Sequence, residues 1–242
     1  MADPPRKRMV RLPVGGEGRA TAQRLKTAKQ RTASSQAWLE RQLNDPYVAE
    51  AKAKGYRSRA AFKMTELDDK LRLIRRGAAV IDLGSAPGGW IQVLLARGAG
   101  KVAGVDLLPM DPLVGAELIE GDFTDPVVAD RLAALIGGPA DLIVSDMAPN
   151  TTGHRQTDHL RIIGLIEAAA AFAERMLKPG GAFVTKAFQG GETAAVIAAL
   201  KRSFENVRTV KPKASRAESS EVYVVATRFR GERRRSSTGS AE

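Results

Sequence analysis

The stretch Val80-Ile-Asp-Leu-Gly-Ser-Ala-Pro-Gly-Gly-Trp90 joins a short apolar run to a glycine-rich turn and the start of a second apolar segment. A short apolar run bounded by glycine is typical of a buried strand, and residues 90–98 have the apolar content of a short helix. Gly84, Gly88 and Gly89 allow positive φ angles and let a ligand approach the backbone. The stretch therefore predicts a strand, a tight turn and a helix, arranged as in many nucleotide-binding sites.

Strands and helices alternate from this turn to residue 229. Strands are predicted at 78–84, 101–107, 116–122, 141–147, 181–190, 206–212 and 221–229. Helices are predicted at 90–98, 126–138, 159–181 and 193–204, with two or three short ones within 35–74, broken at Asp45-Pro46 and Gly55. This alternation predicts an α/β fold, a doubly wound Rossmann-like sheet with helices on both faces. We expect a core domain at 77–229, preceded by a helical segment at 34–76.

The composition excludes several classes of protein. The chain has 242 residues, of which 43% are hydrophobic, enough for a sizeable core. It has no cysteine and two histidines, His154 and His159, so we expect no disulfide, no thiol nucleophile and no metal site. It contains no run of about 18 apolar residues and no apolar segment near its start like that of a signal peptide. We therefore expect a cytoplasmic protein that is not bound to a membrane.

The net charge of +11 is concentrated at the two ends of the chain. Residues 1–33 contain nine basic and two acidic residues, and residues 228–242 contain five basic and two acidic residues. Both ends lack hydrophobic periodicity, so we interpret 1–33 and 230–242 as disordered tails. Such tails either increase solubility or attract a polyanion, since each Lys or Arg that neutralises a phosphate releases a counterion.

Ionisable residues recur where the predicted strands end. They are Asp82, Asp106, Asp122, Asp146 and Lys186. Parallel strands bring their carboxyl ends to one edge of the sheet, which is where ligands bind in this class of fold. A single acid at a strand end is common, but five such groups together favour a functional site.

The acids after the second and third strands suit a nucleoside. Asp106 is placed to bind ribose hydroxyls, and Asp122 suits the exocyclic amine of adenine. The turn at 84–89 is not G-x-G-x-x-G, the spacing that a dinucleotide's pyrophosphate requires. S-adenosylmethionine contains adenosine but no phosphate, so it does not need that spacing. The alternative is a tight turn that binds no ligand.

Lys186 lies within a predicted buried strand, where an apolar residue would be the ordinary choice. It is either a functional amine or a lysine whose stem is buried and whose ammonium reaches solvent.

Together these segments resemble the FtsJ-like, RlmE-type ribosomal RNA 2′-O-methyltransferases. The matching stretches, in the order of the family, are DPYVAEAKAKGYRSRAAFKMTEL, VIDLGSAPGGW, GVDLLPMDP, EGDFTD, SDMAPN, FVTKAFQG and SSEVYVVA. They extend from about Ser34 to Thr227 and leave out both tails. The resemblance implies a mostly parallel sheet whose last strand is antiparallel, so that the start of 221–229 lies at the same edge as Lys186.

The resemblance also implies the roles of particular residues. The family's Lys-Asp-Lys-Glu catalytic set corresponds to Lys63, Asp146, Lys186 and Glu221, with no departure from the pattern. The implied cofactor is S-adenosyl-L-methionine, and the implied cofactor-binding residues are Gly88, Trp90, Asp106, Asp122 and Asp146. Two plainer readings stay open, namely that Lys63 and Glu221 form an ion pair of structural value and that Trp90 is a core residue.

The implied reaction is in-line methyl transfer to the ribose 2′-hydroxyl of a uridine in 23S ribosomal RNA. The implied partner is ribosomal RNA, within the large ribosomal subunit, and we expect a monomer. Alternatives are a tRNA 2′-O-methyltransferase, a non-catalytic RNA-binding ribosome-assembly factor and, disfavoured by the turn, a nicotinamide-dependent oxidoreductase.

The sequence leaves two points of mechanism open. Burial and a second cation, Lys63, favour a neutral Lys186 that acts as a base, whereas the two carboxylates favour a charged Lys186 that orients the hydroxyl. The stretch 51–63, AKAKGYRSRAAFK, interleaves basic and aromatic residues. It either faces RNA, with cations for phosphates and rings for bases, or is a solvated helix face.

Overall fold

The computed structural model describes residues 44–149 and 155–231. The expectations for the tail at 1–33, for most of the tail at 230–242 and for His154 lie outside this part. The chain divides into two units, Met1–Asp45 and Pro46–Glu242, and the elements below belong to the second. Within the described residues, no helix is both long enough and apolar enough to cross a membrane.

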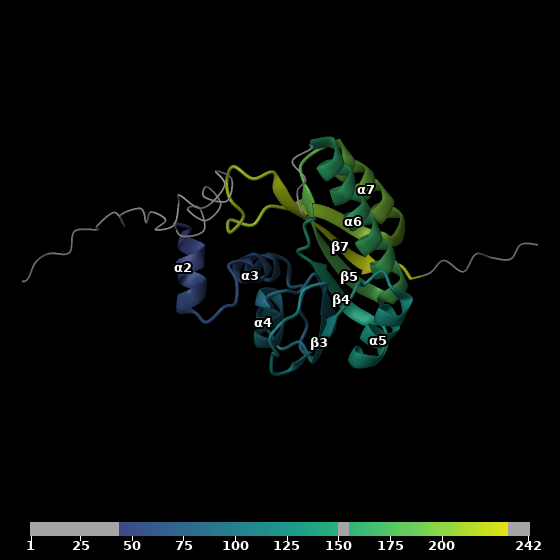
Figure 1. Cartoon of the computed structure of the whole chain (residues 1–242). Helices are drawn as coiled ribbons and strands as arrows, with labels where there is room; N and C mark the ends of the chain where they lie inside the picture. Colours follow the sequence, from purple (N-terminus) through teal and green to yellow (C-terminus); the bar gives the residue numbers. More distant parts are fainter. Residues whose placement is uncertain (1–43, 150–154, 232–242) are drawn as a thin grey trace, which may run out of the picture. The chain divides into compact units, whose positions relative to one another are not determined.

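The strands of the second unit form a seven-stranded sheet in the order β3-β2-β1-β4-β5-β7-β6 (Figure 1). They are β1 (Ala79–Leu83), β2 (Lys101–Asp106), β3 (Ala116–Glu120), β4 (Ala140–Ser145), β5 (Leu177–Phe188), β6 (Phe204–Val210) and β7 (Glu221–Phe229). Strands β3, β2, β1, β4 and β5 pair in parallel, and β7 is antiparallel to both β5 and β6. The doubly wound, mostly parallel sheet with an antiparallel last strand is therefore confirmed.

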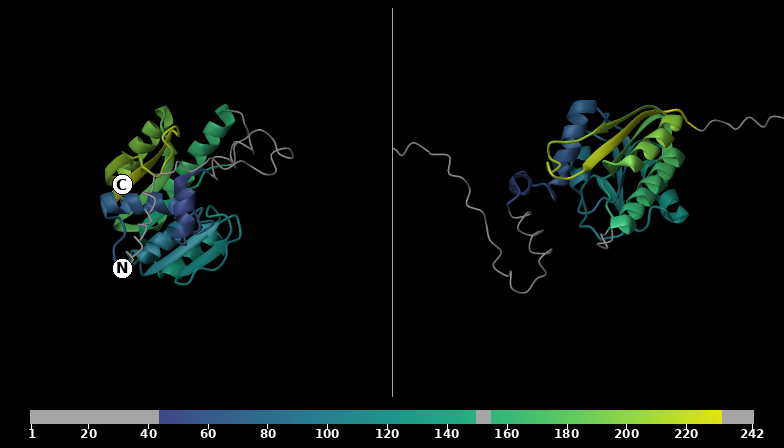
Figure 2. Two further views of the ribbon diagram at one scale, coloured as in Figure 1. Left: turned by 90° about the vertical axis from the view of Figure 1, so that its left-hand side faces the viewer. Right: turned by 90° about the horizontal axis from the view of Figure 1, so that it is seen from above.

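Helices cover both faces of this sheet, as expected (Figures 1 and 2). They are α2 (Pro46–Ala53), α3 (Ala60–Leu71), α4 (Gly89–Ala96), α5 (Pro126–Ile136), α6 (Arg155–Met176) and α7 (Gly191–Ser203). Helices α5, α6 and α7 pack on one face, and α3 and α4 pack on the other. Strand β4 shows the consequence, because Ile143 points to the first set of helices while Leu142 and Val144 point to the second. Burial on both faces explains why the central strands read as continuous apolar runs.

The segment Pro179-Gly180-Gly181 differs from the prediction. The sequence suggests a helix at 159–181 stopped by this tripeptide, but α6 ends at Met176 and β5 begins with the next residue. The register between β4 and β5 shifts here, from Ala140 opposite Leu177 to Leu142 opposite Ala182. Proline has no N–H to donate and Gly180 has a φ of +81°, so the extra residues bulge out of the ladder.

The order of the strands fixes the position of the site. From β1 the chain moves outward to β2 and β3, and then returns to place β4 and β5 on the other side of β1. The carboxyl ends of β1 and β4 therefore flank the point where the winding reverses, which is the usual ligand crevice in such sheets.

Candidate active site

Four charged side chains meet at the carboxyl edge of the sheet. Lys63 comes from α3, Asp146 follows β4, Lys186 lies near the end of β5 and Glu221 begins β7. Lys63 Nζ is 2.9 Å from Glu221 Oε1 and 3.6 Å from Asp146 Oδ2. Phe188 pairs with Glu221 in the antiparallel β5–β7 ladder, which brings the first residue of β7 to the edge where β5 ends. The structure therefore brings together all four residues of the catalytic set implied by the resemblance.

Asp146 holds the amine of Lys186 at two points. Lys186 Nζ lies 2.9 Å from Asp146 Oδ1 and 2.5 Å from the main-chain oxygen of Asp146. Glu221 Oε2 is further away, at 4.0 Å from the same nitrogen. The Lys186 side chain is only 10% exposed, so its amine nitrogen is bonded mainly by protein atoms. A paired amine of this kind answers why a lysine occupies a buried strand.

The cluster favours an ionised Asp146. Burial, the strongest influence, acts to raise the pKa of Asp146, but Lys186, Lys63 and a hydrogen bond from Tyr223 together lower that pKa below its usual range. The Tyr223 hydroxyl donates to Asp146 Oδ1. Burial and the adjacent carboxylate of Asp146 raise the pKa of Tyr223 well above that of a free phenol. Asp146 is thus a carboxylate and Tyr223 a neutral donor.

Ser215 positions Glu221 and was missed by the sequence analysis. Its buried Oγ donates to Glu221 Oε1 over 2.7 Å. The loop that carries Ser215 is tied to α3, because the Glu66 carboxylate accepts hydrogen bonds from the backbone N–H groups of Lys213 and Ala214. Serine is common in loops, so the sequence alone carries no signal for this contact.

A cavity of about 50 Å³ adjoins the cluster at the end of β1. Its walls are Ser58, Ala60, Asp82, Gly84, Ser85, Ala86, Gly89, Trp90 and Asp146. Asp82 is 1% exposed, and its Oδ2 atom has no hydrogen-bond partner in the described part of the chain. Burial first, and then the charges of Asp146 and Asp106, raise the pKa of Asp82 well above its usual value. Asp82 was predicted to lie at this edge of the sheet, without a role in the site.

The remaining acids lie where the sequence placed them. Asp106 ends β2, and its two carboxylate oxygens accept hydrogen bonds from the backbone N–H groups of Ala86 and Leu108, each over 2.9 Å. Asp106 therefore anchors the glycine-rich turn. Asp122 follows β3, and its Oδ1 accepts hydrogen bonds from the backbone N–H and the hydroxyl of Thr124. Neither Asp106 nor Asp122 lines the cavity.

Trp90 and Gly88 both have structural reasons for their identity. Trp90 is 3% exposed, its indole N–H donates to the Ala60 carbonyl over 2.8 Å, and its ring centroid lies 5.7 Å from that of Tyr223. Trp90 is thus a core residue that also lines the cavity. Gly88 has a φ of +105°, and a Cβ atom there would lie 2.7 Å from the side chain of Leu113. The positive φ of the turn, and not only approach of a ligand, therefore favours glycine here.

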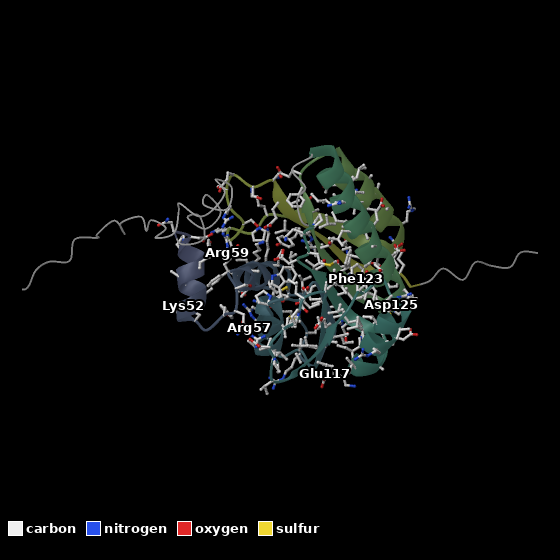
Figure 3. The ribbon with its side chains drawn as sticks, in the orientation of Figure 1. Lys52, Arg57, Arg59, Glu117, Phe123 and Asp125 are labelled. Carbon is white, nitrogen blue, oxygen red and sulfur yellow. The ribbon has the colours of Figure 1, made fainter. Side chains whose placement is uncertain are left out.

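Most cations of the stretch 51–63 already have partners, as the contacts below show. Figure 3 labels three of these cations, Lys52, Arg57 and Arg59. Arg57 donates to three carbonyls, those of Pro87, Asp111 and Pro112. Arg59 donates to the Ala214 carbonyl, and Lys54 pairs with Glu50 at 2.8 Å.

The rings of this stretch pack mainly on one another. Phe62 is 8% exposed, and its centroid lies 5.4 Å from Tyr47 and 5.5 Å from Tyr56. Stacking of Phe62 on bases would therefore require it to leave these contacts. An RNA-facing role for 34–76 stays a prediction, and Lys52 is one of the exposed cations of its described part.

These features define a Rossmann-like methyltransferase. They are the doubly wound sheet, the glycine-rich turn after β1, and the paired lysines and acids at the edge where the winding of the sheet reverses. The chain belongs to the FtsJ-like methyltransferase family, whose model matches residues 56–229.

Curated relatives and a solved structure agree with this assignment. The ribosomal RNA large subunit methyltransferase E of Caulobacter sp. (strain K31) is 63% identical, over 92% of this chain and 100% of that relative. The protein of the same name from Gluconobacter oxydans is 60% identical over 86% of this chain and 78% of its own length. A structure described as a ribosomal RNA methyltransferase of Plasmodium falciparum superposes with a TM-score of 0.67 at 32% identity. It covers 73% of this chain and 100% of its own.

Proposed function

We propose that this enzyme transfers a methyl group from S-adenosyl-L-methionine to the ribose 2′-hydroxyl of a uridine in large-subunit ribosomal RNA. The names of the relatives support the substrate class. The observation that carries the reaction is the Lys63–Asp146–Lys186–Glu221 cluster beside the cavity at the end of β1. Its intact pairing favours an enzyme over a non-catalytic assembly factor. A cytoplasmic location and a monomeric state belong to the same proposal.

The residues that line the cavity suit a cationic group of the cofactor. Its walls include two carboxylates, Asp82 and Asp146, and no Lys, Arg or His. S-adenosylmethionine carries a sulfonium and an α-ammonium group, so the partnerless oxygen of Asp82 suits that ammonium. The pyrophosphate of a nicotinamide dinucleotide would instead face two acids. We assign the ribose to Asp106, the adenine amine to Asp122, and contacts along the turn to Gly88 and Trp90.

Lys186 is proposed to accept the proton of the ribose hydroxyl. The cofactor supplies a methyl group that its sulfonium has already activated. Asp146 Oδ1 and the main-chain oxygen of Asp146 can each accept one N–H of a neutral Lys186 amine. The lone pair of the nitrogen then occupies the remaining tetrahedral position. As the ribose hydroxyl is methylated, its proton would pass to Lys186 Nζ.

The other members of the cluster hold this geometry. Asp146 fixes the amine of Lys186 from two sides, and Lys63 bridges Asp146 and Glu221. Lys63 also places a positive charge beside the site where negative charge develops on the hydroxyl oxygen.

The test is methyl transfer from labelled S-adenosylmethionine to large ribosomal subunits that lack the modification, with tRNA as a parallel substrate. Lys186→Ala should lower the rate by about a hundredfold or more, while cofactor affinity stays within a few-fold. Near wild-type turnover of that variant would overturn the catalytic assignment. Labelling of tRNA but not of the subunits would move the substrate to tRNA.

A further inference from the structure

A second cavity lies at the opposite end of the sheet from the catalytic cluster. It is an open groove of about 750 Å³ lined by Ala171, Glu174, Arg175, Lys201, Arg202, Ser203, Phe229, Arg230 and Gly231. These residues come from the last turns of α6 and α7 and from the end of β7. Glu221 begins β7 and Phe229 ends it, so nine residues at about 3.3 Å each separate the two sites by roughly 25 Å. The groove is therefore no part of the methyl-transfer site.

The groove is strongly basic, with four cations, Arg175, Lys201, Arg202 and Arg230, and one acid, Glu174. None of the four cations forms an ion pair within residues 44–149 and 155–231. Arg175 lies over the ring of Phe172 at 5.8 Å, and Arg230 donates weakly to the Phe204 carbonyl over 3.5 Å. Lys201 and Arg202 form neither an ion pair nor a hydrogen bond through their side chains in the same ranges. Their charge is thus available to an anion.

Helix dipoles explain only part of this arrangement. A cation in the last turn of a helix is favoured by the partial negative charge there, and Arg175, Lys201 and Arg202 occupy such positions. That effect acts on each helix separately. It gives no reason for two helices and the end of β7 to direct four cations into one groove, where like charges repel.

We propose that this groove binds the sugar–phosphate backbone of the RNA substrate at a second point, remote from the reacting ribose. The proposal rests on the proposed function, which supplies a polyanion long enough to reach both sites. The parts of the chain beyond the described residues are poor occupants, because residues 1–43 and 232–242 both contain more basic than acidic residues. The cations around the catalytic edge are mostly engaged within the protein, so a separate contact supplies binding free energy that they do not.

The test compares two double variants that lower the net charge equally. Lys201→Gln with Arg202→Gln removes two groove cations, whereas Lys101→Gln with Arg131→Gln removes an exposed Lys from β2 and an exposed Arg from α5, both outside the segment 34–76. The dissociation constant for the large ribosomal subunit is measured across a salt series. The slope of log affinity against log salt should fall by about 0.7 to 0.9 per lost phosphate contact in the groove variant only. Methyl transfer to a short RNA that spans only the active site should keep its rate.

Equal losses in the two double variants, or no loss in either, would overturn the groove assignment in favour of a general charge effect. A loss of binding to an acidic protein of the subunit, with unchanged binding to naked ribosomal RNA, would also overturn it. Failure of the proposed function gives a different pattern. The wild-type protein would then leave ribosomal RNA unmethylated, while the two salt slopes would still report on the groove.

Discussion

Lys63 and Glu221 are separated by 158 residues in the chain, yet the Lys63 ammonium lies within 3.0 Å of both oxygens of the Glu221 carboxylate. This pair joins a helix that precedes the sheet to the antiparallel strand that follows its parallel part. Asp146 bridges from this pair to Lys186. The cluster at the carboxyl edge of the sheet is therefore held by segments from both ends of the domain. Residues that orient Glu221 should affect the rate of methyl transfer without contacting the cofactor.

Ser215→Ala should slow methyl transfer by about tenfold, which corresponds to about 1.4 kcal/mol of transition-state free energy. The reason is that the Ser215 hydroxyl holds Glu221 Oε1, one of the two oxygens that bind Lys63. The Michaelis constant for the cofactor should not change. Ser220→Ala is the matched control, because Ser220 is an exposed serine beside Glu221. Equal rates in the two variants would show that Ser215 has no positioning role.

Asp82→Asn should weaken cofactor binding by about tenfold to a hundredfold, the range expected when a hydrogen bond to a charged group is lost. Asp82 lines the cavity with a partnerless oxygen, and an amide cannot pair with an ammonium as a carboxylate does. Isothermal calorimetry measures the change. Asp130→Asn, on the exposed side of α5, controls for the loss of one negative charge. An unchanged dissociation constant would remove Asp82 from the cofactor site.

Asp82→Asn should also raise the free energy of unfolding of the cofactor-free protein near neutral pH, although it weakens cofactor binding. The pKa of Asp82 is raised in the folded state, so the folded protein keeps a proton that the unfolded chain releases above about pH 4. The free energy of unfolding therefore falls as the pH rises through the window between the two pKa values. Asparagine cannot ionise and removes this fall. Asp146, whose lowered pKa acts in the opposite sense, is present in both proteins.

Urea unfolding of wild type and Asp82→Asn, at several pH values between about 4.5 and 8, tests the direction of this pH dependence of stability. The stability of the variant relative to wild type should increase with pH. A difference that is flat or that decreases with pH would contradict a raised pKa at Asp82.

Arg57→Gln should lower the melting temperature and weaken cofactor binding, because Arg57 joins the glycine-rich turn at Pro87 to the loop at Asp111 and Pro112. Its charge is already used within the protein. The salt dependence of RNA binding should therefore stay close to that of wild type, as measured by filter binding. Lys52→Gln, which removes an exposed cation of α2, is the comparison. If Arg57→Gln lowers the slope of log affinity against log salt by about 0.7 to 0.9, the value for one phosphate contact, then Arg57 does bind RNA.

The sequence predicted the fold well because local patterns decide it. The glycine-rich turn after Asp82 and the alternation of apolar runs with amphipathic segments predicted the strands and helices of the core. The prediction was wrong at 177–181, where helix α6 gives way to a bulged strand. Proline and glycine stop a helix, but whether a coil or a strand follows depends on the neighbouring β4, which a local pattern does not contain.

By itself, the sequence predicted the kind of sheet from its periodicity, and its motifs predicted the family. The proposal of four catalytic residues came from the resemblance to that family. Only the tertiary structure decided what each charge does. Arg57 and Arg59 hydrogen-bond to carbonyls, Ser215 supports Glu221, and Asp82 has a buried oxygen without a partner. The physical reason is that hydrogen bonding and desolvation depend on which distant segments come within about 3 Å of one another. That proximity is set by the packing of the whole domain.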